Sequence, residues 1–160
     1  MADRRARKKG RQGGTGSFLA LPHTWLDSPE FRALSARATK ALLGLAAQYR
    51  GANNGTLALP RGRHQVFGWG RAHGSVDRAL KELEAAGFVV KTRQGGKNMP
   101  SLYAVTWWAV DRCDGRHDHP ASAAPLHLWK HPEKRDACPT VGQVGPEVGQ
   151  SAPSRRRAAA

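Results

Sequence analysis

Residues 74–108, GSVDRALKELEAAGFVVKTRQGGKNMPSLYAVTWW, constrain the fold of this chain more than any other segment. The first part spaces four apolar residues so that they lie within about 100° of one another on a helix, which predicts one buried face. Those residues are Val76, Ala79, Leu80 and Leu83. Ser75 is the predicted N-cap of this helix and Gly87 its predicted end. The segment therefore predicts a short helix with one apolar face and a sharp C-terminal turn.

Two runs rich in β-branched and aromatic residues come after this helix, FVVKTR and LYAVT, separated by residues 94–101. A glycine-bearing loop between two such runs predicts an antiparallel hairpin with a loose tip. The loop carries Lys97 and is flanked by Lys91 and Arg93. The predicted hairpin is therefore basic at its far end.

Two helix starts precede this segment. Ser28 followed by Pro29 predicts an N-cap with proline at the first helical position, and a single turn to about Leu34. Ser35 caps a longer predicted helix, which Gly51 can end in the left-handed conformation. The apolar residues at helical period in that second helix are Ala38, Ala41, Leu42, Leu45, Ala46 and Tyr49.

The connection between the long helices has weaker signals. TLAL, residues 56–59, alternates like a short strand after the NNG turn signal. Residues 60–74 predict a weak helix with Val66 and Phe67 facing inward, followed by a turn. The glycines of that turn are Gly68, Gly70 and Gly74.

The charge balance is strongly positive, with 26 Lys+Arg against 12 Asp+Glu and a formal net charge of +14. Residues 1–16 carry +5 and residues 130–160 carry +3, so the middle of the chain is still basic. Such a balance favours polyanions as partners, either nucleic acid or an anionic membrane surface. We expect residues 1–16 and 131–160 to be disordered basic tails around one domain, residues 17–130.

Several classes of protein are disfavoured. No run of about 18 apolar residues exists, which predicts no membrane partner, and the basic N-terminus has no apolar segment behind it as a secretory signal would. Two cysteines are too few for a disulfide framework. We therefore expect a bacterial-type cytoplasmic protein.

The predicted order of helix, short strand, weak helix, capped helix, strand, basic loop and strand is similar to the winged helix-turn-helix fold. In bacterial winged-helix regulators a phrase S-x-x-R-A-L-x-x-L-x-x-x-G-F/L-[VI] recurs. Here it reads Ser75, Arg78, Ala79, Leu80, Leu83, Gly87, Phe88 and Val89. The longer stretch 21–108 resembles the N-terminal DNA-binding domain of phage and plasmid replication initiators. The glycine-rich turn at 68–74 departs from a tight helix-turn-helix.

The resemblance implies an α+β fold of three helices and a small antiparallel sheet, and sequence-specific binding of double-stranded DNA. A recognition helix at about 75–86 would read bases while a basic wing at about 91–102 clamps the backbone, in replication initiation or transcription regulation of an element such as a plasmid or phage. The residues expected to contact DNA are Arg71, His73, Ser75, Asp77, Arg78, Lys81, Lys91, Arg93 and Lys97.

The residues support the same interpretation without the family. A helix start offers free backbone N–H groups to a phosphate, and a helix fits the DNA major groove, where arginine can donate two hydrogen bonds to guanine. Arg78 and Lys81 lie opposite the apolar face of the helix that starts at Ser75. Asp77 could accept from a cytosine amino group, or orient Arg78 or Lys81.

Other interpretations remain open. A charged helix face is usually only solvated, and the basic tails could equally be solubilising termini. The same body could serve as a protein-interaction adaptor. The five tryptophans could stack on unpaired bases, although burial in a small domain is the simpler account. No heptad stripe supports a homodimer.

Catalysis and cofactors have little support. The soft ligands Cys113, His117, His119 and Cys138 lack the paired spacing of structural zinc sites, so we expect no metal and a reduced, partly buried Cys113. No phosphate-binding loop of the GxxxxGK[ST] type is present, and GWGRAHG lacks the βαβ context of a dinucleotide site. We therefore expect a protein without enzymatic activity and without a cofactor, and keep a metal-dependent nuclease as a third alternative.

Overall fold

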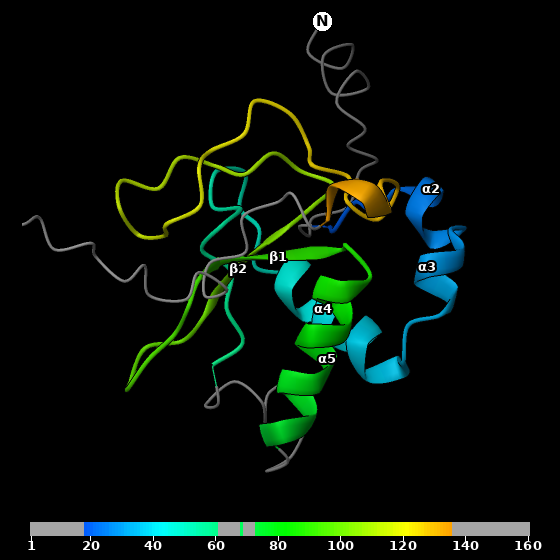
Figure 1. Cartoon of the computed structure of the whole chain (residues 1–160), viewed down its shortest axis with the longest axis horizontal. Coiled ribbons are helices and arrows are strands. Elements are labelled where there is room, and N and C mark those ends of the chain that lie inside the picture. The colour runs from blue at the N-terminus through cyan, green and yellow to red at the C-terminus, as the bar shows by residue number, and fades with distance from the viewer. Residues whose placement is uncertain (1–17, 61–67, 69–72, 136–160) are drawn as a thin grey trace, which may run out of the picture.

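The computed structural model describes residues 18–60, 68 and 73–135, and within them the chain has an α+β fold. Two single-turn helices are followed by two longer helices, a two-stranded antiparallel sheet and a 3-10 turn (Figure 1). The helices are α2 (His23–Leu26), α3 (Pro29–Arg32), α4 (Ala36–Ala46) and α5 (His73–Ala85). The strands are β1 (Val89–Arg93) and β2 (Leu102–Val105), and the 3-10 turn is η2 (Pro132–Lys134).

The two predicted helix starts at the N-terminal side are confirmed. The Ser28 hydroxyl accepts a hydrogen bond from the Phe31 amide at 3.2 Å, and Pro29 opens α3. The Ser35 hydroxyl accepts from the Ala38 amide at 3.2 Å and caps α4. Each bond satisfies an amide that the first helical turn leaves without a partner.

The end of α4 differs from the prediction. The helix stops at Ala46, although Gly51 does take the left-handed conformation at φ +100°. Gln48 explains the earlier stop, because its side-chain amide donates to the Gly44 carbonyl at 2.7 Å and covers one of the free carbonyls there. Tyr49, the last residue of the predicted stripe, therefore lies beyond the helix, where its ring stacks on Trp108 at 4.0 Å.

The start of α5 is also a correction. The helix begins at His73, so Gly74 is helical and Ser75 lies inside the first turn instead of capping it. Ser75 is only 6% exposed. It shares a helix face with Ala79, one turn further on, and Ala79 is buried in the core. The remaining face assignments are confirmed, because the predicted apolar residues of α5 are buried.

Gly87 ends α5 as predicted. The Phe88 amide donates to the Leu83 carbonyl at 3.1 Å and the Gly87 amide to the Glu84 carbonyl at 3.0 Å. This pair of bonds is a Schellman motif, which requires the left-handed conformation that Gly87 adopts at φ +80°. The turn places Phe88, which is fully buried, at the entry to β1.

The hairpin is confirmed, with one irregularity. Val89 pairs with Val105 and Lys91 with Tyr103, but a bulge comes next and Arg93 pairs with Leu102. The predicted strand at 56–59 is a single bridge, in which Leu57 and Tyr103 exchange backbone hydrogen bonds of 3.1 and 2.8 Å.

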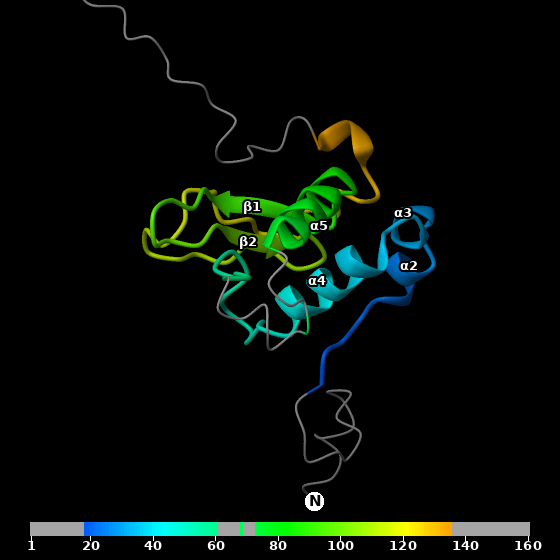
Figure 2. The ribbon, with the colours of Figure 1, turned by 90° about the horizontal axis from the view of Figure 1, so that it is seen from below.

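The sheet separates two apolar clusters. The larger one packs α4 and α5 on the face that carries Val89 and Tyr103. The smaller one packs Val110 and the partly buried Leu126 on the face that carries Val90 and Ala104. Figures 1 and 2 accordingly show the helices on one side of the strands and the long loop 106–131 on the other.

The long loop returns its aromatic rings to the core, as predicted. Trp107 and Trp129 are buried, and so is Trp25 near the start of the domain. Trp107 stacks on Trp25 with ring centroids 5.0 Å apart, and Trp129 stacks on Phe88 at 5.9 Å. Burial accounts for these three tryptophans.

Some predictions lie outside the described residues. They concern both tails up to residue 17 and from residue 136, the weak helix with Val66 and Phe67, and the residues Trp69, Gly70, Arg71 and Cys138. Past the predicted boundary at 130, the described chain continues to Arg135. Across the part that is described, the helices are all too short or too polar to cross a membrane.

Candidate nucleic-acid interface

The outer face of α5 is polar and open. Asp77, Arg78 and Lys81 are exposed, as predicted. At about 100° per residue, Lys81 and Arg78 lie within about 60° of each other around the helix. The Arg78 Nε donates to the Gly74 carbonyl at 3.2 Å, which lays the side chain back along the helix toward its N-terminus. Two cations and one carboxylate therefore share the face of α5 that no other described element covers.

The tip of the hairpin is tightly built. The Gly96 amide donates to the Met99 carbonyl at 3.0 Å, and the Met99 amide donates back at 3.1 Å. The Gly95 amide donates to the Ser101 hydroxyl at 3.0 Å. A Cβ at Gly95 would lie 2.5 Å from the Ser101 nitrogen, so only glycine lets the two arms approach this closely. The sequence predicted a loose tip, and this hydrogen bonding corrects it.

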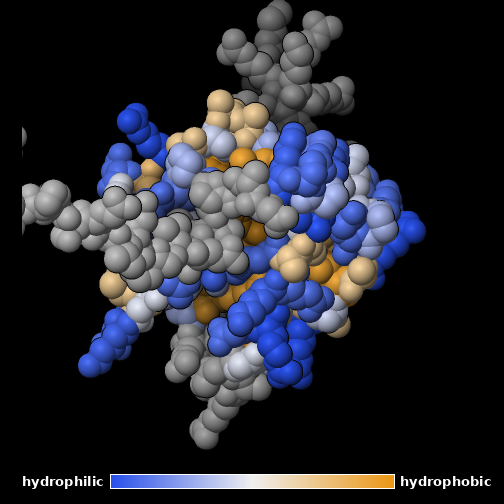
Figure 3. Space-filling model, in the orientation of Figure 1, coloured by the Kyte–Doolittle hydropathy of each residue, from blue (hydrophilic) through white to orange (hydrophobic). Residues whose placement is uncertain are grey.

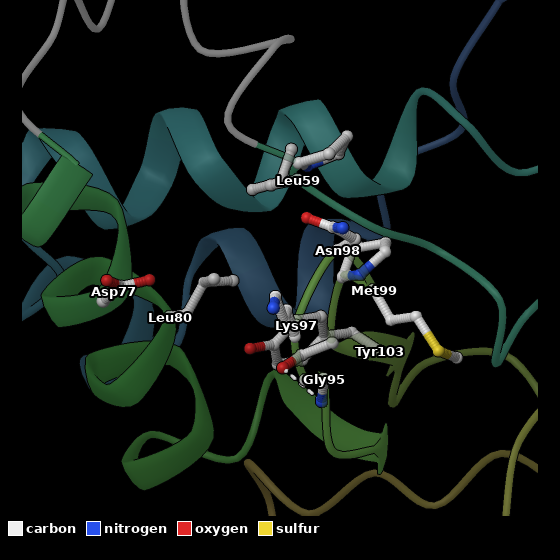
Figure 4. A pocket seen from close by; sticks show the side chains of 12 residues that line it. Leu59, Asp77, Leu80, Gly95, Lys97, Asn98, Met99 and Tyr103 are labelled. Atoms are coloured by element: carbon white, nitrogen blue, oxygen red, sulfur yellow. Dashed lines mark hydrogen bonds between the residues drawn. The ribbon is translucent and has the colours of Figure 1, made fainter.

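Helix and tip enclose one concavity, which we call the α5–hairpin hollow. Its volume is about 570 Å³. It is lined by Leu59, Pro60, Asp77, Leu80, residues 95–101 and Tyr103. Figure 4 shows Asp77 and Leu80 on the α5 side and Lys97 on the hairpin side. On this face of the molecule, hydrophilic side chains gather over α5, with apolar ones beside them (Figure 3).

Three of the predicted DNA-contact residues lie neither on the open face of α5 nor in the lining of the α5–hairpin hollow. Ser75 is buried, Lys91 pairs with Glu84 at 3.6 Å, and the Arg93 guanidinium donates to the Arg116 carbonyl at 2.9 Å. Because the bulge shifts the register by one residue, Lys91 and Arg93 oppose neighbouring residues of β2 and so point to opposite faces of the sheet. Of the three predicted cations of the hairpin, Lys97 is the one that lines the α5–hairpin hollow.

The other predicted DNA-contact residues lie in the hollow, on the open face of α5, or outside the described residues. Asp77 and Lys97 line the same hollow, and Arg78 and Lys81 lie on the adjoining open face of α5. His73 opens α5, and its side chain, like the whole of Arg71, lies outside the described residues. Residues that line the hollow but were not predicted include Leu59, Met99 and Tyr103. The only sequence signal for Met99 is its place in the middle of the hairpin loop.

Two groups have raised pKa values, Tyr103, which lines the hollow, and Glu84, which lies on α5. Burial raises the pKa of Tyr103 to about 12, and the negative charge of Glu84 adds to the effect. Burial also raises the pKa of Glu84, which the ammonium group of Lys91 lowers only in part. Tyr103 is therefore a neutral hydrogen-bonding group at any physiological pH.

Glu84→Gln tests this electrostatic assignment. A carboxyl with a raised pKa in the folded state adds stability that is present below its unfolded pKa and is lost as pH rises through the folded pKa. We expect the free energy of unfolding of the wild type, relative to Glu84→Gln, to increase as pH falls from neutral toward the ordinary pKa of a glutamate, about 4.3. Urea unfolding of both proteins at the two ends of this pH range measures it. Curves that stay parallel would contradict a raised pKa for Glu84.

The soft ligands do not form a metal centre among the described residues, where no group of three His, Cys, Asp or Glu side chains could hold an ion. Cys113 is a free, half-buried thiol whose sulfur accepts a hydrogen bond from the His117 amide at 3.2 Å. The His117 ring contacts the Asp111 carbonyl at 3.2 Å. These residues are accounted for by the packing of the long loop.

The chain was compared with known proteins, and any proposal for its function therefore rests on the geometry described above. No protein-family model, no curated protein and no solved structure matches the chain.

Proposed function

We propose that this protein binds double-stranded DNA in a sequence-specific manner through a winged-helix arrangement of α5 and the β1–β2 hairpin, without catalytic activity. One observation carries the proposal. The exposed cationic face of α5 adjoins a hollow whose far wall is the tip of a hairpin that carries Lys97. A duplex can thus meet a helix and a cationic loop on one side of the molecule.

The roles derive from the chemistry of the groups. α5 has the diameter to enter the major groove, where Arg78 can donate to the O6 and N7 atoms of a guanine. Asp77 can accept from the amino group of a cytosine, which disfavours other bases at that position. Lys97 at the tip supplies a point charge for a phosphate, which fixes orientation and adds no base preference. The net charge of +14 favours the encounter with a polyanion.

Arg78→Ala is the first test of the proposal. The duplex is selected from a random pool with the wild-type protein, and affinities are compared by gel shift on it and on a scrambled duplex. We expect Arg78→Ala to weaken binding to the selected duplex by roughly 1–3 kcal/mol, with much less change on the scrambled one.

The matched control is Arg112→Ala. Arg112 is exposed on the long loop, which packs on the face of the sheet away from α5, and its replacement removes the same charge. We expect its effect to be small and equal on both duplexes. Equal losses for Arg78→Ala on both duplexes would assign Arg78 to phosphate contact, and equal losses for the two variants would argue against a specific interface on α5.

The second candidate is a protein-interaction adaptor, favoured by the apolar part of the hollow. Leu59, Leu80 and Met99 line it together with the polar groups, and such a mixed concavity can also hold a peptide. Salt dependence separates the two functions. DNA binding loses affinity steeply as salt rises because counterions are released, whereas an apolar protein contact barely responds. A replication or a transcription role fits the DNA-binding function equally, with a mobile element as a candidate setting.

A further inference from the structure

Met99 is an apolar side chain that the hairpin displays at its tip. It is 53% exposed, whereas Val89 and Val105 in the body of the hairpin are buried. Figure 4 shows its side chain running away from α5. Packing within the domain therefore gives little reason for an apolar residue at this position.

The backbone that carries Met99 is held in place. Met99 and Gly96 exchange two backbone hydrogen bonds, of 3.0 and 3.1 Å. Asn98 completes the turn in the left-handed conformation at φ 62°, which asparagine tolerates better than most residues. Gly95 packs against the backbone of residues 99–101 with no space for a Cβ. The methionine is thus presented on a preorganised support, so that little ordering is needed when it contacts a partner.

The neighbours of Met99 indicate which partner fits. Lys97 and Asn98 are both exposed beside it. A cation, an amide and an apolar side chain on one narrow tip match the three chemical features of a DNA duplex at a groove, which are the phosphates, the acceptors of the groove floor and the stacked bases. Apolar side chains, methionine among them, enter base steps from the minor groove and bend the duplex by about 20–90°.

We propose that Met99 is an apolar wedge that enters one base step of the bound duplex from the minor groove and bends it, while Lys97 contacts the adjoining phosphate. The inference rests on the proposed DNA-binding function. In this proposal the hairpin tip deforms the DNA. The protein should therefore prefer sites with base steps that unstack easily, such as TA and CA.

The test uses the full chain and the duplex recovered by selection from a random pool. The duplex carries a fluorophore at each end. Energy transfer between the ends reports the bend, and titration reports the affinity. We expect wild-type protein to bend the duplex and Met99→Ala to leave it straighter, with affinity reduced roughly tenfold. Met99→Leu keeps an apolar side chain of similar size and should retain the bend.

Lys97→Ala separates the two parts of the tip. It should reduce the slope of log affinity against log salt by about 1 while the bend persists, whereas Met99→Ala should leave that slope unchanged. Met99 is exposed, so its replacement does not threaten folding. A straight wild-type complex, or an equal bend in wild type and Met99→Ala, overturns the wedge and leaves DNA binding intact. Failure of wild-type protein to retain any duplex overturns both proposals.

Discussion

Replacing Asn54 with alanine is expected to lower the free energy of unfolding by about 3–5 kcal/mol, which is a large part of the stability of a small domain. Asn54 is fully buried. Its side-chain oxygen accepts from the Val105 amide at 2.8 Å, and its amide nitrogen donates to the Val105 and Ala109 carbonyls at 2.9 and 2.8 Å. Alanine leaves these groups buried without a partner, and each such group costs about 1–3 kcal/mol.

The backbone of Asn54 extends the same network. Its amide donates to an Asp111 carboxylate oxygen at 2.7 Å, and its carbonyl accepts from the Asp111 amide at 2.8 Å. The residue therefore joins the turn after α4 to the end of β2 and the start of the long loop. This network holds β2, which is one arm of the hairpin. Loss of the network should therefore also loosen the candidate interface.

The control is the adjacent asparagine. Asn53 is half-buried, and among the described residues its side chain bonds to the backbone of Gln48 and Arg50 within the same turn. We expect Asn53→Ala to cost about 1 kcal/mol, typical of a local side-chain cap. Chemical denaturation of the three proteins measures the difference. Equal losses at positions 53 and 54 would contradict the role given to the buried amide.

Gly87→Ala is expected to destabilise the domain by about 3 kcal/mol or more, the sum of two separate effects. The left-handed conformation at φ +80° costs an L-residue about 1 kcal/mol. In addition, a Cβ at this position would lie 2.6 Å from the carbonyl carbon of Leu128 and 2.7 Å from the nitrogen of Trp129. The segment that carries these two buried side chains would have to move away from the end of α5.

Gly74→Ala is the matched control on the same helix. Gly74 is helical, and a Cβ there meets no described residue within 4 Å. The same substitution should therefore stabilise the protein by about 0.5–1 kcal/mol, because alanine loses less backbone entropy than glycine in a helix. Thermal unfolding should show a lower Tm for Gly87→Ala and a higher Tm for Gly74→Ala, each relative to the wild type. A destabilised Gly74→Ala, or a tolerated Gly87→Ala, would contradict these backbone assignments.

Periodicity and capping residues predicted most of the framework. The apolar stripe of α4, the buried face of α5 and the left-handed Gly87 obey local rules that can be applied directly to the sequence. The beginning of α5 does not, because a serine near a helix start satisfies the capping pattern whether it is the cap or lies in the first turn. Ser75 was therefore predicted as the N-cap although it is the third residue of α5, and its burial could not be read from the pattern.

The candidate interface was predictable only in part. Arg78, Lys81 and Lys97 were predicted to be exposed from helix geometry and from the position of the loop, and they are. Lys91 and Arg93 look equivalent in the sequence, but the bulge between them sends their side chains to opposite faces. Bulges and the long-range contacts of a loop such as 106–131 depend on packing between distant segments, which single-sequence patterns do not encode.

The claim that α5 and the hairpin tip grip one duplex is tested most directly by photo-crosslinking from defined positions. A photoreactive side chain replaces Lys81 in one protein, Lys97 in a second and Arg112 in a third, and each is irradiated on the same selected duplex. We predict crosslinks from positions 81 and 97 within about one helical turn, roughly 10 base pairs, and none from position 112. Crosslinks from position 112 with none from 81 and 97 would contradict the claim.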